Sequence, residues 1–438
     1  MTGRAYGGDD GRAGSTDDDL PFVVDDDGVT MRGAFFARVA ARAVPWRGET
    51  AVALQAPTST ALLLELLAAR AAGAVPVLLS PRWPAAVARE ASARVGAGLR
   101  VLDADARAGL ADVGFTSGTT GAPRAVAHTR QGHDDVARAG NAHLPFGPGQ
   151  RWLVSLPLVH VGGLGIVARA LCGGGALAIP RAGEPIVDAA LRLGATHLSL
   201  VRAQLVDLLR SPRFDDVVRR LAVVLVGGGP APAALLDEAV RRGLPVAQTW
   251  GMTETHAQVA TSLLGEPATC GQPLRGRMVR VDDDGVLGVR GVGLSAGFVD
   301  ERGLSPLPVD ADGFFVTGDR GHLDAQGRVV VTGRAGLRLV SGGEKIEPEA
   351  IEGAILSCVD VDDAVVVPVE HPRWGQRPVA FVRARTWAPS VWLDAVRATL
   401  PKTWVPDAVW PWPDDVEGGK AARALLRARA AAASPSTT

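Results

Sequence analysis

The sequence is poor in the features that define several protein classes. Its three cysteines, Cys172, Cys270 and Cys358, lie far apart, with neither metal-ligand spacing nor a disulfide framework. No apolar run is long enough to cross a membrane, and the first residues lack the basic-then-apolar order of a signal peptide. A net charge of −1 provides no electrostatic footprint for nucleic acid. We therefore expect a cytoplasmic protein with no transmembrane segment and no nucleic-acid partner.

The length and periodicity of the chain predict an α/β protein of more than one domain. With 438 residues, 47% of them hydrophobic, it exceeds what one core usually organises. Residues 1–19 are rich in Gly and Asp and are expected to form a disordered tail. Between residues 20 and 334, strands such as 99–103 alternate with helices such as 34–44 and 202–210, which predicts doubly wound parallel sheets.

The periodicity changes in the second half of the chain. Past Gly265, short β-like segments separated by Gly and Asp indicate a small β subdomain at the end of the large N-terminal domain. Residues 335–429 are expected to form a small, mobile α+β C-terminal domain, and residues 430–438 a frayed tail.

The segment F-T-S-G-T-T-G, residues 115–121, is the strongest functional signal. It follows a buried-strand pattern, Leu110 to Phe115, and Arg124 adds a permanent charge three residues beyond it. Successive backbone N–H groups in a glycine turn, with Ser and Thr hydroxyls, bind anionic oxygens. The alternative is a polar turn between two strands. The Walker pattern is absent, so a different phosphate-binding loop is predicted.

Two further motifs follow predicted strands. A glycine triplet, Gly227 to Gly229, lies at a strand's carboxyl end, where ligands bind in open α/β sheets. In T-W-G-M-T-E, residues 249–254, Trp250 could stack on a base and Glu254 could hold Mg²⁺. An ordinary strand-to-helix turn, a buried core Trp and a solvated Glu are the alternatives.

The remaining candidates are less specific by composition. Asp319 in T-G-D-R-G suits the two hydroxyls of a ribose, and Arg334 is a fixed cation fifteen residues on. The turn S-G-G-E, residues 341–344, is also compatible with a simple hairpin. His160 ends an apolar stretch, where a lone histidine is more often a core residue than part of a site. Lys420 follows two glycines that would give it a mobile approach.

Taken together and in this order, these motifs resemble the adenylate-forming enzymes, from about Gly33 to Leu426. The resemblance implies a large domain that holds an acid and ATP and a small domain that rotates between two half-reactions. The acid attacks the α-phosphate of Mg·ATP, giving an acyl-adenylate and pyrophosphate, and a thiol, usually of coenzyme A, then displaces AMP. ATP, Mg²⁺ and coenzyme A are the implied cofactors and co-substrates.

The resemblance also implies a role for each matching residue. His160 would line the acyl pocket and gate the thiol tunnel, and Glu254 would hold Mg²⁺. Thr253 would contact the α-phosphate, and Lys420 would bridge it to the carboxylate. The nucleotide-binding set is Thr116, Ser117, Gly118, Thr119, Thr120, Gly121, Arg124, Gly227, Gly228, Gly229, Trp250, Gly251, Asp319 and Arg334; Gly342, Gly343 and Glu344 would move in for thioester formation.

Two positions depart from the family pattern. Gly336 replaces the usual Asp or Lys at the hinge, and Arg124 replaces the usual lysine of the phosphate loop.

Residues 155–164, 341–352 and 371–380 are most similar to the o-succinylbenzoate–CoA ligases of menaquinone biosynthesis. Arg202 is a candidate partner for that substrate's second carboxylate. Three alternatives remain: a generic aryl- or fatty-acyl-CoA ligase, a non-catalytic nucleotide-binding homologue, and a phosphoryl transferase that forms ADP. A homodimer is possible.

Overall fold

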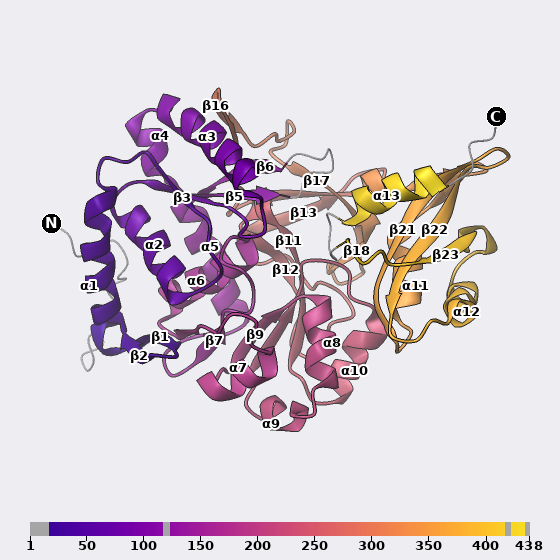
Figure 1. The fold of residues 1–438 in the computed structure, drawn as a ribbon, viewed down its shortest axis with the longest axis horizontal. Helices are drawn as coiled ribbons and strands as arrows, with labels where there is room; N and C mark the ends of the chain where they lie inside the picture. Colours follow the sequence, from indigo (N-terminus) through magenta and orange to yellow (C-terminus); the bar gives the residue numbers. More distant parts are fainter. Residues whose placement is uncertain (1–16, 117–122, 417–421, 434–438) are drawn as a thin grey trace.

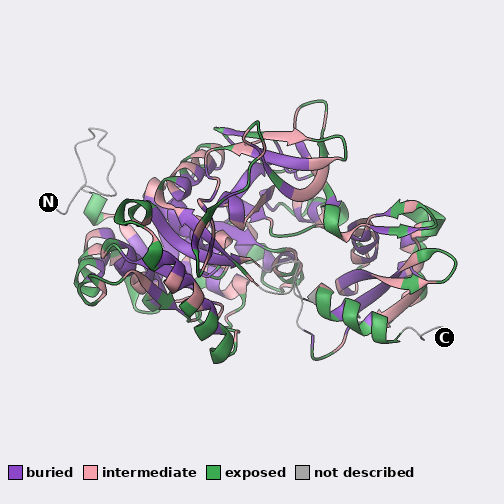
Figure 2. Ribbon diagram, turned by 90° about the horizontal axis from the view of Figure 1, so that it is seen from above, coloured by how far each residue is buried: buried purple, intermediate pink, exposed green. Residues whose placement is uncertain are grey.

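The computed structural model describes residues 17–116, 123–416 and 422–433. In these residues the chain forms a large N-terminal α/β domain and a smaller C-terminal domain, as the sequence predicts (Figure 1). The C-terminal domain forms a separate lobe with its own buried interior (Figure 2). None of the described helices is both long and apolar enough to span a bilayer.

The largest sheet has eight strands in the order β12-β11-β10-β9-β7-β8-β1-β2. Its six inner strands are parallel neighbours, whereas β2 and β12 are antiparallel at the two edges. The predicted parallel sheet is therefore confirmed for the inner strands. The bounds are β1 Pro21–Asp25, β2 Gly28–Met31, β7 Arg151–Leu153, β8 Ala176–Ala178, β9 His197–Leu200, β10 Val223–Val226, β11 Val246–Met252 and β12 Ala257–Thr261.

A second sheet of six strands, in the order β16-β15-β6-β5-β4-β3, brings the first motif to its place. Strands β3 to β5 are parallel, and β5 and β6 form an antiparallel pair that ends with Thr116 opposite Arg124. The connection between these two residues is the glycine-rich segment. The bounds are β3 Ala51–Leu54, β4 Val75–Leu78, β5 Leu110–Thr116, β6 Arg124–Thr129, β15 Gly297–Asp300 and β16 Gly303–Pro306.

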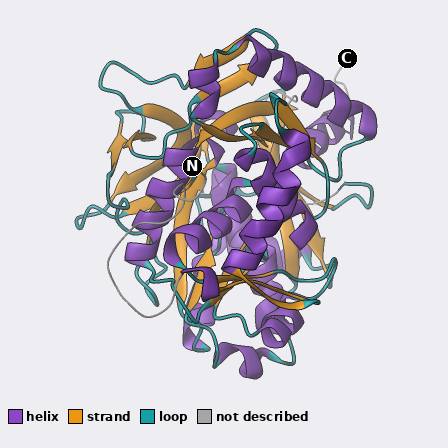
Figure 3. Ribbon diagram, turned by 90° about the vertical axis from the view of Figure 1, so that its left-hand side faces the viewer, coloured by secondary structure: helices purple, strands orange, loops and turns teal. Residues whose placement is uncertain are grey.

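Helices pack across the strands of both sheets in the large domain (Figure 3). Helix α2 illustrates how the sequence determines a helix and its packing. The Ser59 hydroxyl caps its start by accepting from the Leu62 N–H, and its buried face carries four leucines. The bounds are α1 Arg32–Ala43, α2 Thr60–Ala71, α3 Ala85–Val101, α4 Ala104–Ala108, α5 Arg130–His143, α6 Val161–Gly173, α7 Ile186–Leu193, α8 Arg202–Arg210, α9 Phe214–Val218 and α10 Ala233–Arg241.

One predicted strand of this domain is wrong. Residues 99–103 were expected to be extended, but α3 continues through them to Val101. Leu99 is buried and Val101 is exposed. Residues two apart would share one face of a strand but lie on nearly opposite sides of a helix, so this burial pattern also fits a helix. Gly98 allows this helix to lie against the sheet, because a Cβ there would approach the Asp300 carbonyl oxygen to 1.8 Å.

The predicted β subdomain is a four-stranded antiparallel sheet, β13-β14-β17-β18. The C-terminal domain has the sheet β20-β19-β22-β21, with β23 parallel to β22. The bounds are β13 Arg277–Val281, β14 Val286–Gly291, β17 Phe315–Leu323, β18 Val329–Arg334, β19 Leu339–Ser341, β20 Glu344–Ile346, β21 Val361–His371, β22 Gly375–Ala384, β23 Ala408–Pro411, α11 Pro348–Leu356, α12 Pro389–Thr399 and α13 Ala422–Ala433.

Two described segments near the chain ends contain regular structure that was not expected. Asp17–Asp19 form a short 3-10 turn within the segment predicted as a disordered tail. Helix α13 runs through 430–433, where a frayed end was expected. Alanine has the highest helix propensity, and Ala430 is buried in a cluster with Leu426 and Trp412, so packing supports the last turn.

Candidate active site

The site lies at the carboxyl edge of the eight-stranded sheet. Because β9, β10 and β11 are parallel, the segments that follow them meet at one edge. Gly227 packs on this edge so closely that a Cβ would lie 2.7 Å from Cγ2 of Thr249. Gly228 has φ +80°, and a Cβ there would approach Val201 to 3.2 Å. The triplet therefore gives an open backbone surface beside β11, the arrangement predicted for a flat ring.

Trp250, Asp319 and Arg334 form one hydrogen-bonded group. The Trp250 Nε1–H donates to one Asp319 oxygen at 2.8 Å, and the Arg334 Nε–H lies 2.7 Å from the other. Asp319 and Arg334 face each other across β17 and β18. Trp250 is 6% exposed and packs in the core of the β subdomain. Its ring therefore orients Asp319 and offers little open face for stacking on a base.

Thr253 and Glu254 lie on a short 3-10 turn, η3 (Thr253–Thr255), directly after β11. Glu254 is 7% exposed, and one of its carboxylate oxygens lies 3.8 Å from Nη2 of Arg124. The Thr253 methyl group faces Gly114 on β5. The turn thus connects the eight-stranded sheet to the strand that ends in the glycine-rich segment.

Gly251 is required where the chain enters this turn. A Cβ at this position would lie 1.6 Å from the Ala257 carbonyl oxygen, which no local shift could accommodate. The glycine predicted for the nucleotide site is therefore also essential to the shape of the turn.

Thr116 and Arg124 flank the predicted phosphate-binding loop. The Thr116 hydroxyl is buried and has no hydrogen-bond partner among the described residues, which is unusual for a polar atom unless it serves a ligand. Arg124 packs its guanidinium on the Phe298 ring. Ser117, Gly118, Thr119, Thr120 and Gly121 lie outside the described residues.

His160 and Arg202 begin the helices that follow β7 and β9. His160 is the exposed residue before α6, and its pKa is lowered by desolvation and by the charge of Arg82. Arg202 instead contacts the C-terminal domain, where its Nη2 donates to the Asp362 carbonyl oxygen at 2.8 Å and to the Asp363 carboxylate at 3.1 Å. The structure therefore gives Arg202 a partner other than the substrate carboxylate predicted for it.

The candidates of the C-terminal domain are not brought to the sheet edge. Gly342 and Gly343 form the turn of the β19–β20 hairpin, both with positive φ, and Glu344 accepts from the Trp404 indole at 3.0 Å. Their contacts lie within this domain. Lys420 is outside the described residues. On its C-terminal side, Arg423 lies 2.7 Å from Glu352, which fixes the start of α13 to the same domain.

Arg169 is a buried charge that the sequence reasoning missed. It is 3% exposed on α6, donates to Asn141 and Gln258, and has no carboxylate partner in the part of the chain that the structure describes. Burial lowers its pKa to about 9. A single arginine within the apolar run V-G-G-L-G-I-V-A-R was the signal that could have identified it.

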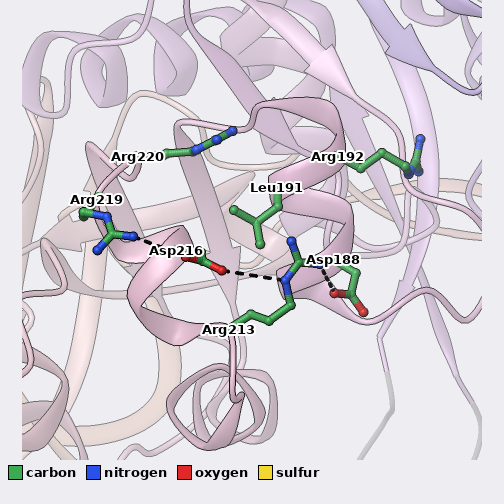
Figure 4. A pocket seen from close by; sticks show the side chains of 7 residues that line it. All are labelled: Asp188, Leu191, Arg192, Arg213, Asp216, Arg219 and Arg220. Atoms are coloured by element: carbon green, nitrogen blue, oxygen red, sulfur yellow. Dashed lines mark hydrogen bonds and ion pairs between the residues drawn. The ribbon is translucent and has the colours of Figure 1, made fainter.

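Two hollows lie outside this edge. One of about 650 Å³ lies between the two domains and is lined by Arg82 from one side and by residues 382–384, 387, 411–414 and 416 from the other. Another of about 430 Å³ lies between α7 and α9 (Figure 4). Its central Arg213 is already paired with Asp188 at 2.9 Å and Asp216 at 3.9 Å, so we assign it no role.

The fold and the candidate site define a two-domain α/β protein with a predicted nucleotide site, and comparison with known proteins identifies its family. The model of the AMP-binding enzyme family matches residues 103–297, and the model of the AMP-binding enzyme C-terminal domain matches residues 350–417. Together they cover more than half of the chain. The chain therefore belongs to the AMP-binding enzymes, the adenylate-forming superfamily predicted from its motifs.

Individual relatives fall in one subgroup. The chain is 36% identical to the 2-succinylbenzoate–CoA ligase of Salmonella typhimurium over 311 residues, 71% of this chain and 66% of the relative. It is 35% identical to that of Bacillus cereus over 283 residues, 61% and 59% of the two chains. These alignments span about three fifths to two thirds of the curated relatives. A solved structure, an arginine-to-lysine variant of E. coli MenE with bound OSB-AMS, superimposes with a TM-score of 0.80 at 26% identity, over 95% of this chain and 96% of that one.

Proposed function

We propose that this protein is an AMP-forming acid–CoA ligase. The observation that supports it most directly is that β11 and the turn after it link residues of three sheets: Glu254 lies 3.8 Å from Arg124, the pairing partner of Thr116, and Trp250 donates to Asp319. Thr116 would bind phosphate, Glu254 Mg²⁺ and Asp319 ribose. A carboxylate would first displace pyrophosphate from ATP, and the thiol of coenzyme A would then displace AMP.

The residues present fit Mg·ATP. Mg²⁺ prefers carboxylate oxygens combined with phosphate oxygens, and Glu254 is a nearly buried carboxylate whose nearest cation is the phosphate-loop Arg124. Bound Mg²⁺ would supply charge neutralisation at the phosphates. Since the reaction brings two anions together, Arg124 and Lys420 would stabilise the charge that develops at the α-phosphate. Asp319 would orient the ribose, because Trp250 and Arg334 fix both of its oxygens.

The acid that we propose is o-succinylbenzoate. The named relatives and the three similar stretches of sequence support it. Its second carboxylate needs a cation, and two arginines are candidates: Arg202, engaged with Asp363 in this structure, and Arg169, which lacks a carboxylate partner among the described residues. Arg169→Lys and Arg202→Lys distinguish them. The variant at the true binding residue raises KM for o-succinylbenzoate at least tenfold, without changing KM for ATP.

A product assay tests the proposal. Incubation with Mg·ATP, coenzyme A and o-succinylbenzoate should release AMP and pyrophosphate and form the thioester. Turnover with benzoates or fatty acids but not with o-succinylbenzoate would identify a generic ligase. ADP as the product would contradict the ligase assignment, and nucleotide binding without turnover would indicate a non-catalytic homologue. We also propose a cytoplasmic homodimer, which light scattering on the purified chain tests.

A further inference from the structure

Beneath the Thr253–Thr255 turn lies a buried polar cluster to which neither the motifs nor the comparisons assign a role. It contains three histidines whose rings lie 4.8–5.3 Å apart, His128, His133 and His256, and one carboxylate, Asp112. His128 and Asp112 are both fully buried, and Arg70 also contacts Asp112 through a 2.5 Å ion pair. His128 Nδ1 and His133 Nε2 lie 2.7 and 2.8 Å from the Asp112 carboxylate oxygens. These are hydrogen-bond lengths, so the cluster is a hydrogen-bonded network.

His128 lies between two oxygen atoms. Its Nδ1 lies 2.7 Å from Oδ1 of Asp112, and its Nε2 lies 2.9 Å from the Thr253 carbonyl oxygen. A carbonyl oxygen only accepts, and an ionised carboxylate only accepts. Burial raises the pKa of Asp112, but the interactions with His133 and His128 outweigh this effect, so that the pKa lies well below its usual value. Both ring nitrogens of His128 therefore face acceptor oxygens, with the Asp112 carboxylate on one side of the ring and the Thr253 carbonyl group on the other.

The other two histidines have different partners. His256 accepts the Thr129 N–H at Nε2 and donates from Nδ1 to the Gly293 carbonyl oxygen, so it is neutral. His133 donates from Nε2 to Asp112. Among these rings, only His128 connects the carboxylate directly to the turn.

The turn itself needs external support. It is followed by two non-glycine residues in the left-handed region, His256 with φ +51° and Ala257 with φ +77°. Such a backbone is costly and persists only where its surroundings fix it. The turn's own closing hydrogen bond, from the His256 N–H to the Thr253 carbonyl oxygen, is long at 3.3 Å.

Three successive carbonyl oxygens of the turn are each bound from outside it. That of Thr253 accepts from His128 at 2.9 Å, and that of Glu254 accepts from the Ser295 N–H at 2.8 Å. That of Thr255 accepts from Nη2 of Arg277 at 2.7 Å. One of the three donors, Arg277, is a cation. The three donors hold the backbone in the orientation that presents the Thr253 and Glu254 side chains toward Gly114 and Arg124.

We propose that His128, held by Asp112, is a positioning residue that fixes the Thr253–Glu254 turn for binding and activation of Mg·ATP. It touches no substrate and acts through the Thr253 carbonyl group. The inference rests on the proposed function, because it gives the turn the nucleotide role assigned there. It predicts that loss of His128 impairs the adenylation step and spares the second half-reaction.

The test uses one substitution at two histidines. In His128→Gln, both amide protons sit on one nitrogen, so the side chain cannot donate to two acceptors on opposite sides. In His133→Gln, the amide can still donate to Asp112, its one bond in the cluster. We expect His128→Gln to raise KM for Mg·ATP and lower kcat for pyrophosphate release, with kcat/KM reduced at least tenfold. Thioester formation from preformed acyl-adenylate, and every rate of His133→Gln, should change less than threefold.

A double variant tests the mechanism of the effect. In Asp112→Asn combined with His128→Gln, the Asn oxygen can accept from Arg70 and His133, and its amide can donate to the Gln oxygen. The Gln nitrogen then donates to the Thr253 carbonyl oxygen, so the connection is restored without charge. We expect it to recover most of the adenylation rate lost in His128→Gln alone.

A measurement independent of turnover separates this inference from the ligase assignment. Hydrogen exchange of a peptide covering residues 251–257 should be faster in His128→Gln than in His133→Gln. The two variants are compared at temperatures equally far below their melting temperatures, so that global stability does not account for the difference. Equal exchange in the two variants, or equal loss of both half-reactions, would overturn the positioning role. If the wild type releases no AMP with any acid, the ligase proposal fails, while the exchange comparison still decides whether His128 holds the turn.

Discussion

Arg202, the first residue of α8, lies 3.1 Å from the Asp363 carboxylate of the C-terminal domain, and this ion pair joins the two domains. Eight residues further along the same helix, Arg210 pairs with Asp362 at 2.7 Å and donates to the Val359 carbonyl oxygen at 2.8 Å. Two arginines from one helix therefore bind one short segment of the small domain. These bonds stabilise the domain orientation seen in this structure.

Removal of both arginines should shift the balance between domain orientations. Partly exposed ion pairs contribute about 0–1 kcal/mol each, so Arg202→Ala with Arg210→Ala should change the ratio of the two half-reaction rates by about two- to tenfold. The melting temperature of the large domain should barely change. Pyrophosphate release and thioester formation from preformed adenylate measure the two rates. Arg213→Ala, which breaks ion pairs within the large domain, is the control, and an unchanged ratio in the double variant would contradict the interpretation.

Loss of the Glu254 charge should raise the Mg²⁺ requirement. Glu254→Gln keeps the shape of a nearly buried side chain and removes the anion that we propose to hold the metal. We expect the Mg²⁺ concentration for half-maximal adenylation to rise at least tenfold and kcat to fall at saturating ATP. Exposed Glu266→Gln is the control. A Mg²⁺ dependence equal to the wild type would remove Glu254 from the metal site.

The sequence predicts the parts of the site that follow from local pattern and sheet rules. The glycine triplet and Thr249 were expected at neighbouring strand ends, and parallel pairing of β10 and β11 brings them together. Helix α8 has the bounds predicted from its periodicity. These succeed because apolar spacing and the carboxyl-edge rule act over short stretches of chain.

The parts that were missed depend on distant partners. The role of His128 was not predicted, because its partner Thr253 lies 125 residues away. Arg202 was assigned to a substrate because nothing local indicates Asp363, 161 residues on. The β1–β2 hairpin was missed because its strands are only five and four residues long and are joined by an acidic turn. Tertiary contacts decide each of these cases.

Acid should destabilise the protein well above the range where carboxylates titrate. His197 is fully buried and bonded to the Pro145 carbonyl oxygen at 3.0 Å, and burial lowers its pKa to about 4. Between pH 6.5 and 4 the unfolded chain therefore binds a proton at this position that the folded chain does not, so stability falls as the pH falls. The shift corresponds to at most about 3 kcal/mol.

Thermal unfolding between pH 7.5 and 4.5 measures this effect. The melting temperature of the wild type should drop across the range, and that of His197→Gln should drop less steeply, although it starts lower. His322→Gln, at an exposed position, should keep the wild-type slope. Parallel curves for the wild type and His197→Gln would show that His197 is not part of the acid response.

Lys420 should serve one half-reaction only. The segment that contains it is bounded by Val416, whose carbonyl oxygen accepts from Trp412 and Arg383, and by Arg423, which is fixed to Glu352. Both anchors belong to the C-terminal domain. The Lys420 ammonium would neutralise charge where the carboxylate meets the α-phosphate, and removal of one such group typically lowers kcat about 10²- to 10³-fold.

We therefore expect Lys420→Ala to lower pyrophosphate release by about that factor. Thioester formation from preformed acyl-adenylate should stay within about threefold of the wild type, because that step requires coenzyme A and not the lysine. Lys402→Ala, at an exposed position of the same domain, controls for loss of charge. Equal loss of both steps in Lys420→Ala would mean that the lysine supports the fold or the domain orientation. Full activity in both steps would place the charge that activates the acid on another residue.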